Sequence, residues 1–193
     1  MNFDDIKLRA KEIMAPQIGN LILVFLIYNL ILSGISSFSL GFAWVLIYGP
    51  LSVGTAGVLL KLDRGETFTI DEMFSGFNDF GKNLLAGVLI SFYTLLWSLL
   101  LFVPGIMAML SYSMTFYILK ENPELSAEAA ITASKNLMMG HKWELFGLVA
   151  SFLGWWLLSI VTFGLALIYV MPYFNSALTI YYQTLKHSKN ISL

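Results

Sequence analysis

The chain has 193 residues, of which 58% are hydrophobic and 12% are charged, and its formal net charge is −1. A soluble domain usually carries about a quarter charged residues, so this composition excludes a globular protein covered by water. The small net charge argues against nucleic acid as a partner. The absence of cysteine excludes disulfides, thiol catalysis and thiolate metal sites.

The charged residues mark where the chain meets water. The 11 basic and 12 acidic residues fall into four segments: 1–12, 61–82, 120–144 and 186–189. Three apolar stretches without charge separate these segments: 13–60, 83–119 and 145–185. A membrane-spanning helix needs about 20 apolar residues, so each stretch is long enough for two spans and too long for one. The fold class that follows is all-α, with one polytopic membrane domain over 1–193.

Two spans are predicted in each apolar stretch, which makes six. They run over about 18–36, 41–60, 83–102, 105–119, 145–161 and 164–184. They pair into three helical hairpins, 18–60, 83–119 and 145–184. Turn residues lie at each fold-back point: Gly and Ser at 33–41, Pro104-Gly105, and Thr162-Phe163-Gly164.

The basic residues predict the topology. Lys and Arg flank both ends of every apolar stretch, and cytoplasmic loops are where these residues collect. Only an even number of crossings per stretch keeps them on one side, so the three hairpins are parallel and both termini are cytoplasmic. A cleaved signal peptide is the rival interpretation of the first 36 residues. It is disfavoured because Asp4, Asp5 and Glu12 make the amino-terminal region acidic.

A short amphipathic helix is predicted before each hairpin, at about 3–14, 69–80 and 126–142. Thr69 and Glu72 have the spacing of a capping box, and Ser126 precedes the third helix. The expected apolar faces are Ile6, Ala10 and Ile13; Ile70, Met73, Phe74, Phe77 and Phe80; and Ala127, Ala130, Ile131, Ser134, Leu137 and Met138. These faces either lie along the cytoplasmic surface of the membrane or cap the helix bundle, and periodicity does not separate the two.

The second and third hairpins resemble each other at an offset of 60 residues. The matching positions are Lys82, Gly87, Ser91 and Phe92 in one and Lys142, Gly147, Ser151 and Phe152 in the other. Each hairpin therefore repeats a pair of small residues four positions apart. Membrane helices approach closely at such pairs, so we expect Gly87, Ser91, Gly147 and Ser151 to pack helix on helix.

The predicted spans contain no Asp, Glu, Lys, Arg or His. Proton relays and charged filters need such groups within the membrane, and catalysis needs positioned acids, bases or nucleophiles. We therefore expect a non-enzymatic protein without metal or cofactor. His141, Lys142, Trp143 and Glu144 lie at the cytoplasmic mouth of the fifth span. They are interpreted either as a contact for a lipid headgroup or a partner or, preferably, as an interfacial anchor built on Trp143.

The polar groups within the predicted spans are neutral. Asn29, Tyr48, Tyr112, Tyr173 and Asn175 either hydrogen-bond between helices, which we favour, or line a path for a neutral or amphipathic solute.

Two prolines interrupt the second spans of the first and third hairpins. Pro50 and Pro172 each free a backbone carbonyl and kink the helix, which makes each a hinge or a packing device. Small residues follow Pro50, and this run lets another helix come close. The stretch from Pro172 to Asn175 is where we expect a cavity.

The carboxyl-terminal part of the chain resembles the bacterial membrane protein family catalogued as domain of unknown function 975. The resemblance rests on Asn122-Pro123, Met139-Gly140-His141-Lys142, Gly154-Trp155, Thr162-Phe163-Gly164 and Pro172-Tyr173, and covers roughly 65–185. It implies six spans in the bacterial cytoplasmic membrane and no established function. More distantly, the plan resembles the membrane domain of some glycerophosphodiester phosphodiesterases. No activity follows from that likeness, because the chain has nothing similar to their catalytic domain.

Two functions remain open at this point. The first is a non-enzymatic module of accessory, regulatory or immunity type that binds a lipid or a partner protein. That partner is another membrane protein or a second copy of the chain. The alternative is a transporter or channel for a neutral or hydrophobic solute such as a lipid or peptide.

Overall fold

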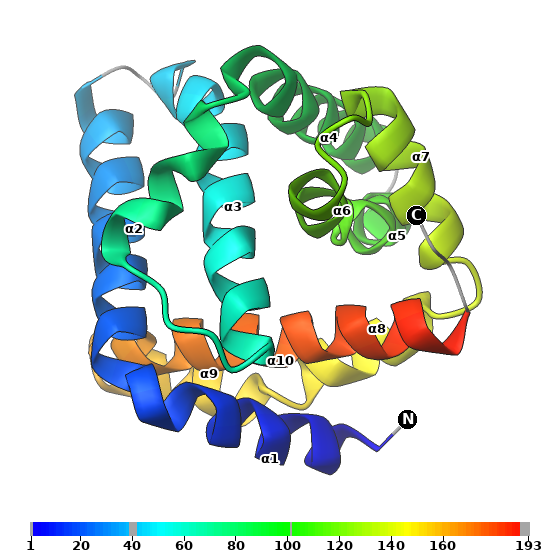
Figure 1. The fold of residues 1–193 in the computed structure, drawn as a ribbon. Helices are drawn as coiled ribbons and strands as arrows, with labels where there is room; N and C mark the ends of the chain where they lie inside the picture. The colour runs from blue at the N-terminus through cyan, green and yellow to red at the C-terminus, as the bar shows by residue number, and fades with distance from the viewer. Residues whose placement is uncertain (1, 39–41, 101, 190–193) are drawn as a thin grey trace.

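The computed structural model describes residues 2–38, 42–100 and 102–189 and is drawn in Figure 1. The described residues form helices joined by turns, and none of them is in a strand. In chain order the helices are α1 (Phe3–Met14), η1 (Ala15–Gln17), α2 (Ile18–Phe38), α3 (Phe42–Asp63), η2 (Ile70–Phe77), α4 (Phe80–Leu100), α5 (Phe102–Tyr112), α6 (Thr115–Glu121), α7 (Ala127–Leu137), α8 (Lys142–Ala150), α9 (Leu153–Val161) and α10 (Leu167–Ser188). The all-α class is confirmed.

The helix ends agree with the predicted fold-back points only in part. The turn at Thr162-Phe163-Gly164 is confirmed, since the backbone takes positive φ angles of 52° at Phe163 and 88° at Gly164. The turn predicted at Pro104-Gly105 is wrong, because both residues lie in the first turn of α5. Proline is tolerated there, where a missing N–H leaves no helical bond unmade. The first fold-back point falls at residues 39–41, outside the described residues.

Two predicted spans are broken. The span expected over 105–119 is divided at Ser113 and Met114 into α5 and α6. The span expected over 145–161 is divided at Ser151 and Phe152 into α8 and α9. The matching positions in the second hairpin, Ser91 and Phe92, lie inside the continuous helix α4. The hairpins matched at an offset of 60 residues therefore differ in local structure.

Four helical segments of the described chain are long and apolar enough to cross a membrane: Phe3–Gly34, Trp44–Asp63, Phe80–Leu99 and Lys142–Val161. This length and composition suggest a membrane protein. The count of six spans is not confirmed by these segments. α5 and α6 are short helices of 11 and 7 residues, and α10 carries several Tyr, Thr and Asn side chains among its apolar residues.

Helix α3 is the centre of the fold. It contacts α2, η2, α4, α6 and α10. Of its apolar stretch 67% is buried inside the protein, against 17% of the apolar stretch of α4. In Figure 1, α2 and α3 run alongside each other, and α1 and α10 run across their ends. The outer sides of α2, α4 and α9 stay apolar although exposed, as at Leu30, Leu99 and Ile160. Exposed apolar faces on several helices are rare in soluble monomers and typical of surfaces that meet lipid.

The three predicted amphipathic segments are packed on the bundle. All six residues of the face expected for α7 are buried. On α1 the expected residues Ile6 and Ala10 are buried, Ile13 is only partly buried, and Met14 is buried beside them. Ser126 caps α7 by accepting a hydrogen bond from the backbone N–H of Ala129 at 3.2 Å. These two faces are therefore covered by protein, as the bundle-capping interpretation requires.

The middle amphipathic segment differs from its prediction. Residues 70–77 form the 3₁₀ helix η2 rather than an α-helix, and the Thr69 side chain caps no backbone N–H. Met73 is buried, but Phe74 and Phe80 of the expected apolar stripe are 41% and 42% exposed. With about three residues per turn, η2 places the buried residues Met73 and Gly76 on one face and Phe74 on the next. Phe80 lies beyond η2, at the start of α4. The third segment ends at Leu137 and not at 142, because Gly140 turns the chain with a φ of 86°.

Glycines allow η2 and α4 to touch the backbone of α3. A Cβ on Gly54 would overlap the carbonyl oxygen of Met73, and a Cβ on Gly49 would overlap that of Asn83. From the other side, a Cβ on Gly76 would overlap the carbonyl oxygen of Pro50. The close approach expected of the small residues after Pro50 is therefore present. The atoms that an added Cβ would overlap belong to the backbone, so no side-chain movement can relieve the overlap.

We expect Gly54→Ala to destabilise the protein by about 1–3 kcal/mol or more, since overpacking against fixed backbone forces helices apart. The matched control is Gly19→Ala in α2, where an added Cβ meets nothing within 4 Å. Thermal unfolding in detergent, followed by size-exclusion chromatography, measures both variants. Equal unfolding temperatures for the two variants would contradict the backbone contact.

Candidate functional site

A cavity of about 550 Å³ lies between the helices, within the range typical of small-molecule sites. Its wall is built from α2, α3, α4, α5, α6, α8, α9 and α10. All three predicted hairpins therefore contribute to it. Of the residues proposed from the sequence for a cavity or hinge, Asn29, Tyr48, Tyr112 and Asn175 line the cavity. Pro50, Pro172 and Tyr173 are not part of the lining.

The lining is aromatic and neutral. Its largest polar side chains are four tyrosines and two asparagines: Tyr28, Tyr48, Tyr112, Tyr117, Asn29 and Asn175. None of the described residues that line it is Asp, Glu, Lys, Arg or His. Such a wall offers hydroxyl and amide hydrogen bonds and apolar contact, and it supplies no partner for a charged group.

Hydroxyl groups gather on one side of the cavity. The Tyr28 hydroxyl lies 3.2 Å from the Ser52 oxygen, and either atom can donate. Tyr48 lies close to the same serine and packs edge-on against Phe116 of α6 at 5.5 Å between ring centres. These contacts hold the tyrosines of α2 and α3 so that their hydroxyls meet at Ser52.

The two asparagines bond to their own helices. Asn29 Nδ2 donates to the Phe25 carbonyl at 2.7 Å, and Asn175 Nδ2 donates to the Met171 carbonyl at 2.9 Å. Each amide has one further N–H and two acceptor positions on its oxygen. Among the described residues neither side chain hydrogen-bonds to a second helix, although interhelical bonding was the favoured interpretation.

The predicted hinge residues lie in the core. Pro50 and Pro172 are inside α3 and α10 and are buried. Tyr173 is 2% exposed and packs edge-on against Phe152 at 5.1 Å between ring centres. Lys11 of α1 lies 5.5 Å from the centre of the Tyr173 ring. Tyr173 thus joins α1 and the break between α8 and α9 to α10.

The cluster predicted at the mouth of the fifth span lies at the start of α8. His141 Nδ1 is 3.0 Å from Glu144 Oε2, and the His141 carbonyl accepts a hydrogen bond from the Tyr181 hydroxyl at 2.9 Å. Trp143 is 70% exposed and packs edge-on against Phe146. Lys142 begins the helix. An exposed tryptophan beside polar groups fits both the anchor and the headgroup interpretation.

The small-residue pairs contact different partners. Gly87 lies against the backbone of Gly49, so this pair packs α4 on α3. Gly147 instead lies against the Phe3 ring of α1. Ser91 and Ser151 both donate to backbone carbonyls of their own helices. In addition, the Ser151 carbonyl accepts a hydrogen bond from Lys7 Nζ of α1 at 2.9 Å. The second pair therefore holds α1 rather than another long apolar helix.

Sequence reasoning missed a buried carboxylate that ties the charged segments together. Glu121, at the end of α6, is 9% exposed in its side chain. It pairs with Arg64 at 3.1 Å and with Lys186 at 2.6 Å, and it accepts a hydrogen bond from the Tyr182 hydroxyl at 2.7 Å. Tyr182 also stacks on Tyr117, a residue of the cavity wall, at 5.2 Å between ring centres. Charge spacing along the chain gives no signal for this meeting of distant residues.

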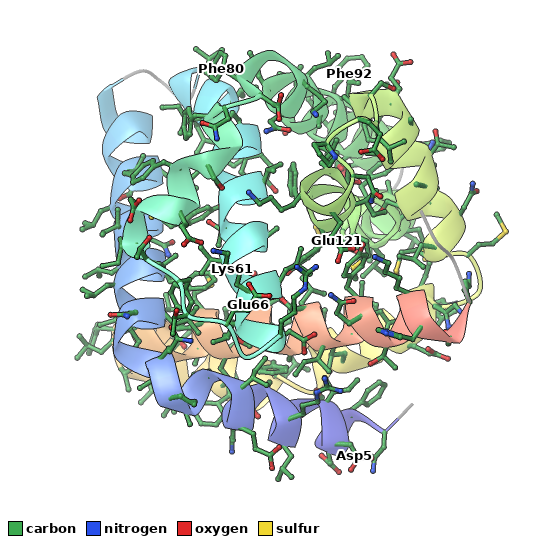
Figure 2. The ribbon with its side chains drawn as sticks, in the orientation of Figure 1. Asp5, Lys61, Glu66, Phe80, Phe92 and Glu121 are labelled. Carbon is green, nitrogen blue, oxygen red and sulfur yellow. The ribbon has the colours of Figure 1, made fainter. Side chains whose placement is uncertain are left out.

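Further contacts join the remaining charged segments. Arg9 of α1 pairs with Asp63 at 3.3 Å, and Lys61 pairs with Glu72 at 2.8 Å. Lys189 donates to carbonyls at the end of α7. Figure 2 shows Lys61, Glu66 and Glu121 gathered toward the middle of the view, while Phe80 and Phe92 lie at its upper edge. All four charged segments are thus connected to one another.

Two ionisable groups of α6 have altered acidity. Burial alone would raise the pKa of Glu121, but hydrogen bonds from Lys186 and Tyr182 and the charges of Lys186 and Arg64 hold this pKa below its usual value. Burial lowers the pKa of Lys120, and the charge of Lys61 lowers it further, although Glu72 acts in the opposite sense. Lys120 donates to the Ser75 hydroxyl at 2.8 Å.

We expect Glu121→Gln to destabilise the protein by about 1–3 kcal/mol, because Arg64 and Lys186 lose a charged partner. A carboxyl whose pKa is lowered by folding contributes stability above its unfolded pKa of about 4.3, and this stability is lost as the pH falls through the folded value. The variant should therefore lose less stability than the parent between about pH 5 and 3. Thermal unfolding across this pH range measures both effects.

The control for this prediction is Glu124→Gln, which removes an exposed carboxylate without an ion pair among the described residues. Its stability and pH dependence should match the parent. If Glu121→Gln and Glu124→Gln behave alike, Glu121 does not join the charged segments.

Within the described residues no three His, Asp or Glu side chains lie close enough together to bind one ion. The polar chemistry of the site is therefore that of the cavity wall and of the ion pairs around Glu121.

The comparisons with known proteins agree with one part of the resemblance. A family model described as protein of unknown function (DUF975) matches residues 99–189, which is just under half of the chain. No curated protein and no solved structure matches the chain, so the likeness to glycerophosphodiester phosphodiesterases is not shown. The match to residues 99–189, from α5 to the end of α10, supports the resemblance to this family of unknown function.

Proposed function

We propose that the protein is a non-enzymatic integral membrane protein that binds a lipid or another hydrophobic molecule between its helices. The observation that carries this proposal is the uncharged cavity of about 550 Å³ with walls from all three predicted hairpins. A mainly apolar cavity with a few convergent polar groups is the usual form of a site for a small amphipathic molecule.

The proposed placement puts six spans in the bacterial cytoplasmic membrane with both termini in the cytoplasm. It is supported by the ion pairs that join the charged segments and by the exposed apolar side chains of α2, α4 and α9. Charged groups collect where water is, and lipid accepts the apolar faces. The turn at Phe163, which is 99% exposed, then lies on the outer side.

Single-cysteine labelling tests this placement, because the chain contains no cysteine of its own. We expect Phe163→Cys to react with a membrane-impermeant maleimide added to intact cells. Glu66→Cys should react only after the membrane is permeabilised. Both positions are exposed, so access to water on the two sides decides the result. Labelling of Glu66→Cys from outside intact cells would overturn the topology.

Filling the cavity tests the binding proposal. We expect Ala56→Phe, which adds a ring to the cavity wall, to reduce the lipid that co-purifies with the protein at least several-fold. Native mass spectrometry in a mild detergent measures that lipid. Ser52→Phe is a second filling variant at a less buried position of the same wall.

The control is Leu30→Phe, which places the same aromatic ring on the exposed side of α2. It should keep the parent's bound lipid. Loss of lipid from all three variants, or from none, would contradict binding in this cavity.

The cavity also favours a second candidate, transport of a neutral or hydrophobic solute. Two of its walls belong to α3 and α10, which contain the prolines Pro50 and Pro172. Flux into reconstituted vesicles that is abolished by Ala56→Phe would support transport. Bound lipid without flux would favour the binding module.

A further inference from the structure

We propose that the cavity takes an uncharged amphiphile whose headgroup carries a hydroxyl, and not an anionic phospholipid. This inference rests on the proposed function, because it names the class of molecule that the same cavity binds. Three features of the described residues carry it: the unused hydrogen-bonding groups of two asparagines, the hydroxyl cluster at Ser52, and the absence of charge from the lining.

The two asparagines present unused donors and acceptors. Asn29 and Asn175 each spend one N–H on a carbonyl of the same helix, as described above. The side-chain oxygen and the second N–H of each have no partner among the described residues. Both residues line the cavity, so these groups are available to a molecule bound there. A hydroxyl both donates and accepts, so one hydroxyl can satisfy both groups of an amide, whereas an ester or ether oxygen only accepts.

The cluster at Ser52 supplies a second polar point. The Tyr28 hydroxyl and the Ser52 oxygen share one hydrogen bond between two groups that can each donate and accept. Tyr48 lies close to the same serine, and three hydroxyl groups joined by two hydrogen bonds still have one proton and free lone pairs for a hydroxyl of the ligand. Asn29 follows Tyr28 directly in α2, so the amide and the hydroxyl pair approach the cavity from neighbouring positions.

The lining offers nothing that would hold a phosphate. Phosphate sites in proteins are built from Arg, Lys or backbone N–H groups at free helix starts. The described lining contains no basic residue, and an uncompensated anion in an apolar cavity is strongly disfavoured. One cation does lie close behind the wall. Lys135 of α7 is 5.4 Å from the centre of the Tyr112 ring and 5.8 Å from that of Tyr93, outside the lining.

Lys135 therefore defines the competing ligand class. An anionic lipid could enter only by drawing Lys135 away from the two rings, and its affinity would then depend on that charge. The affinity for a hydroxyl ligand would depend on the asparagines and would not change when Lys135 is replaced. The two classes can be separated by substitution.

The test uses three brominated probes with the same hydrocarbon chain: a long-chain alcohol, the corresponding alkyl phosphate and the unsubstituted hydrocarbon. Trp156 lies in the cavity wall, and bromine quenches tryptophan fluorescence only at short range. Binding in the cavity is measured as the part of the quenching that disappears in Trp156→Phe. The full-length protein is titrated with each probe in detergent.

We expect the alcohol to quench Trp156 at a concentration at least tenfold lower than the phosphate or the hydrocarbon does. Asn29→Leu and Asn175→Leu should each weaken binding of the alcohol by about three- to tenfold, which corresponds to the loss of one hydrogen bond of roughly 1 kcal/mol. Asn29 lies at an exposed position of α2, so its replacement disturbs packing least. Two control variants should leave the affinity for the alcohol unchanged. They are Lys135→Gln and Asn78→Leu, the latter at an exposed position outside the cavity.

Other outcomes overturn different claims. Equal quenching by alcohol and hydrocarbon, unaffected by the asparagine variants, overturns the hydroxyl specificity and leaves cavity binding standing. Tighter binding of the phosphate that is lost in Lys135→Gln assigns the cavity to an anionic lipid. No Trp156-dependent quenching by any probe overturns the proposed function itself.

Discussion

The buried carboxylate of Glu121 pairs with the side chains that hold the charged end of the molecule together. Arg64 reaches it from the end of α3, and Lys186 and Tyr182 reach it from α10. Three segments far apart in the chain are thereby held at one point. A buried anion of this kind is stable only while its cations stay in place. The helices that carry those cations, and the cavity walls that α3, α6 and α10 form, depend on this arrangement.

Two tyrosines, Tyr182 and Tyr117, connect Glu121 to the cavity wall. Tyr182 donates to Glu121 and stacks on Tyr117, and the Tyr117 hydroxyl accepts a hydrogen bond from Thr179 one turn earlier in α10. The seam between α6 and α10 is therefore polar at its charged end and aromatic where it borders the cavity. The uncharged wall begins within about one helical turn of the ion pairs.

A second constraint is the bare backbone of α3. Because η2 and α4 touch α3 at Gly54 and Gly49, these elements have only one way to pack. Tyr48, Ser52 and Ala56 of the same helix line the cavity. Helix α3 thus supplies both the backbone contact and one wall of the cavity.

The sequence alone determined the all-α class, the apolar stretches, the turn at Thr162-Phe163-Gly164 and which residues of α7 share one face, because each depends on local composition or period. Tertiary structure decided that Pro104 starts a helix, that η2 is a 3₁₀ helix, and that Gly147 packs on α1. It also brought Asn29 and Asn175 to one cavity and Arg64 and Lys186 to Glu121. Residues so far apart in the chain share no local pattern, and only helix packing decides which of them meet.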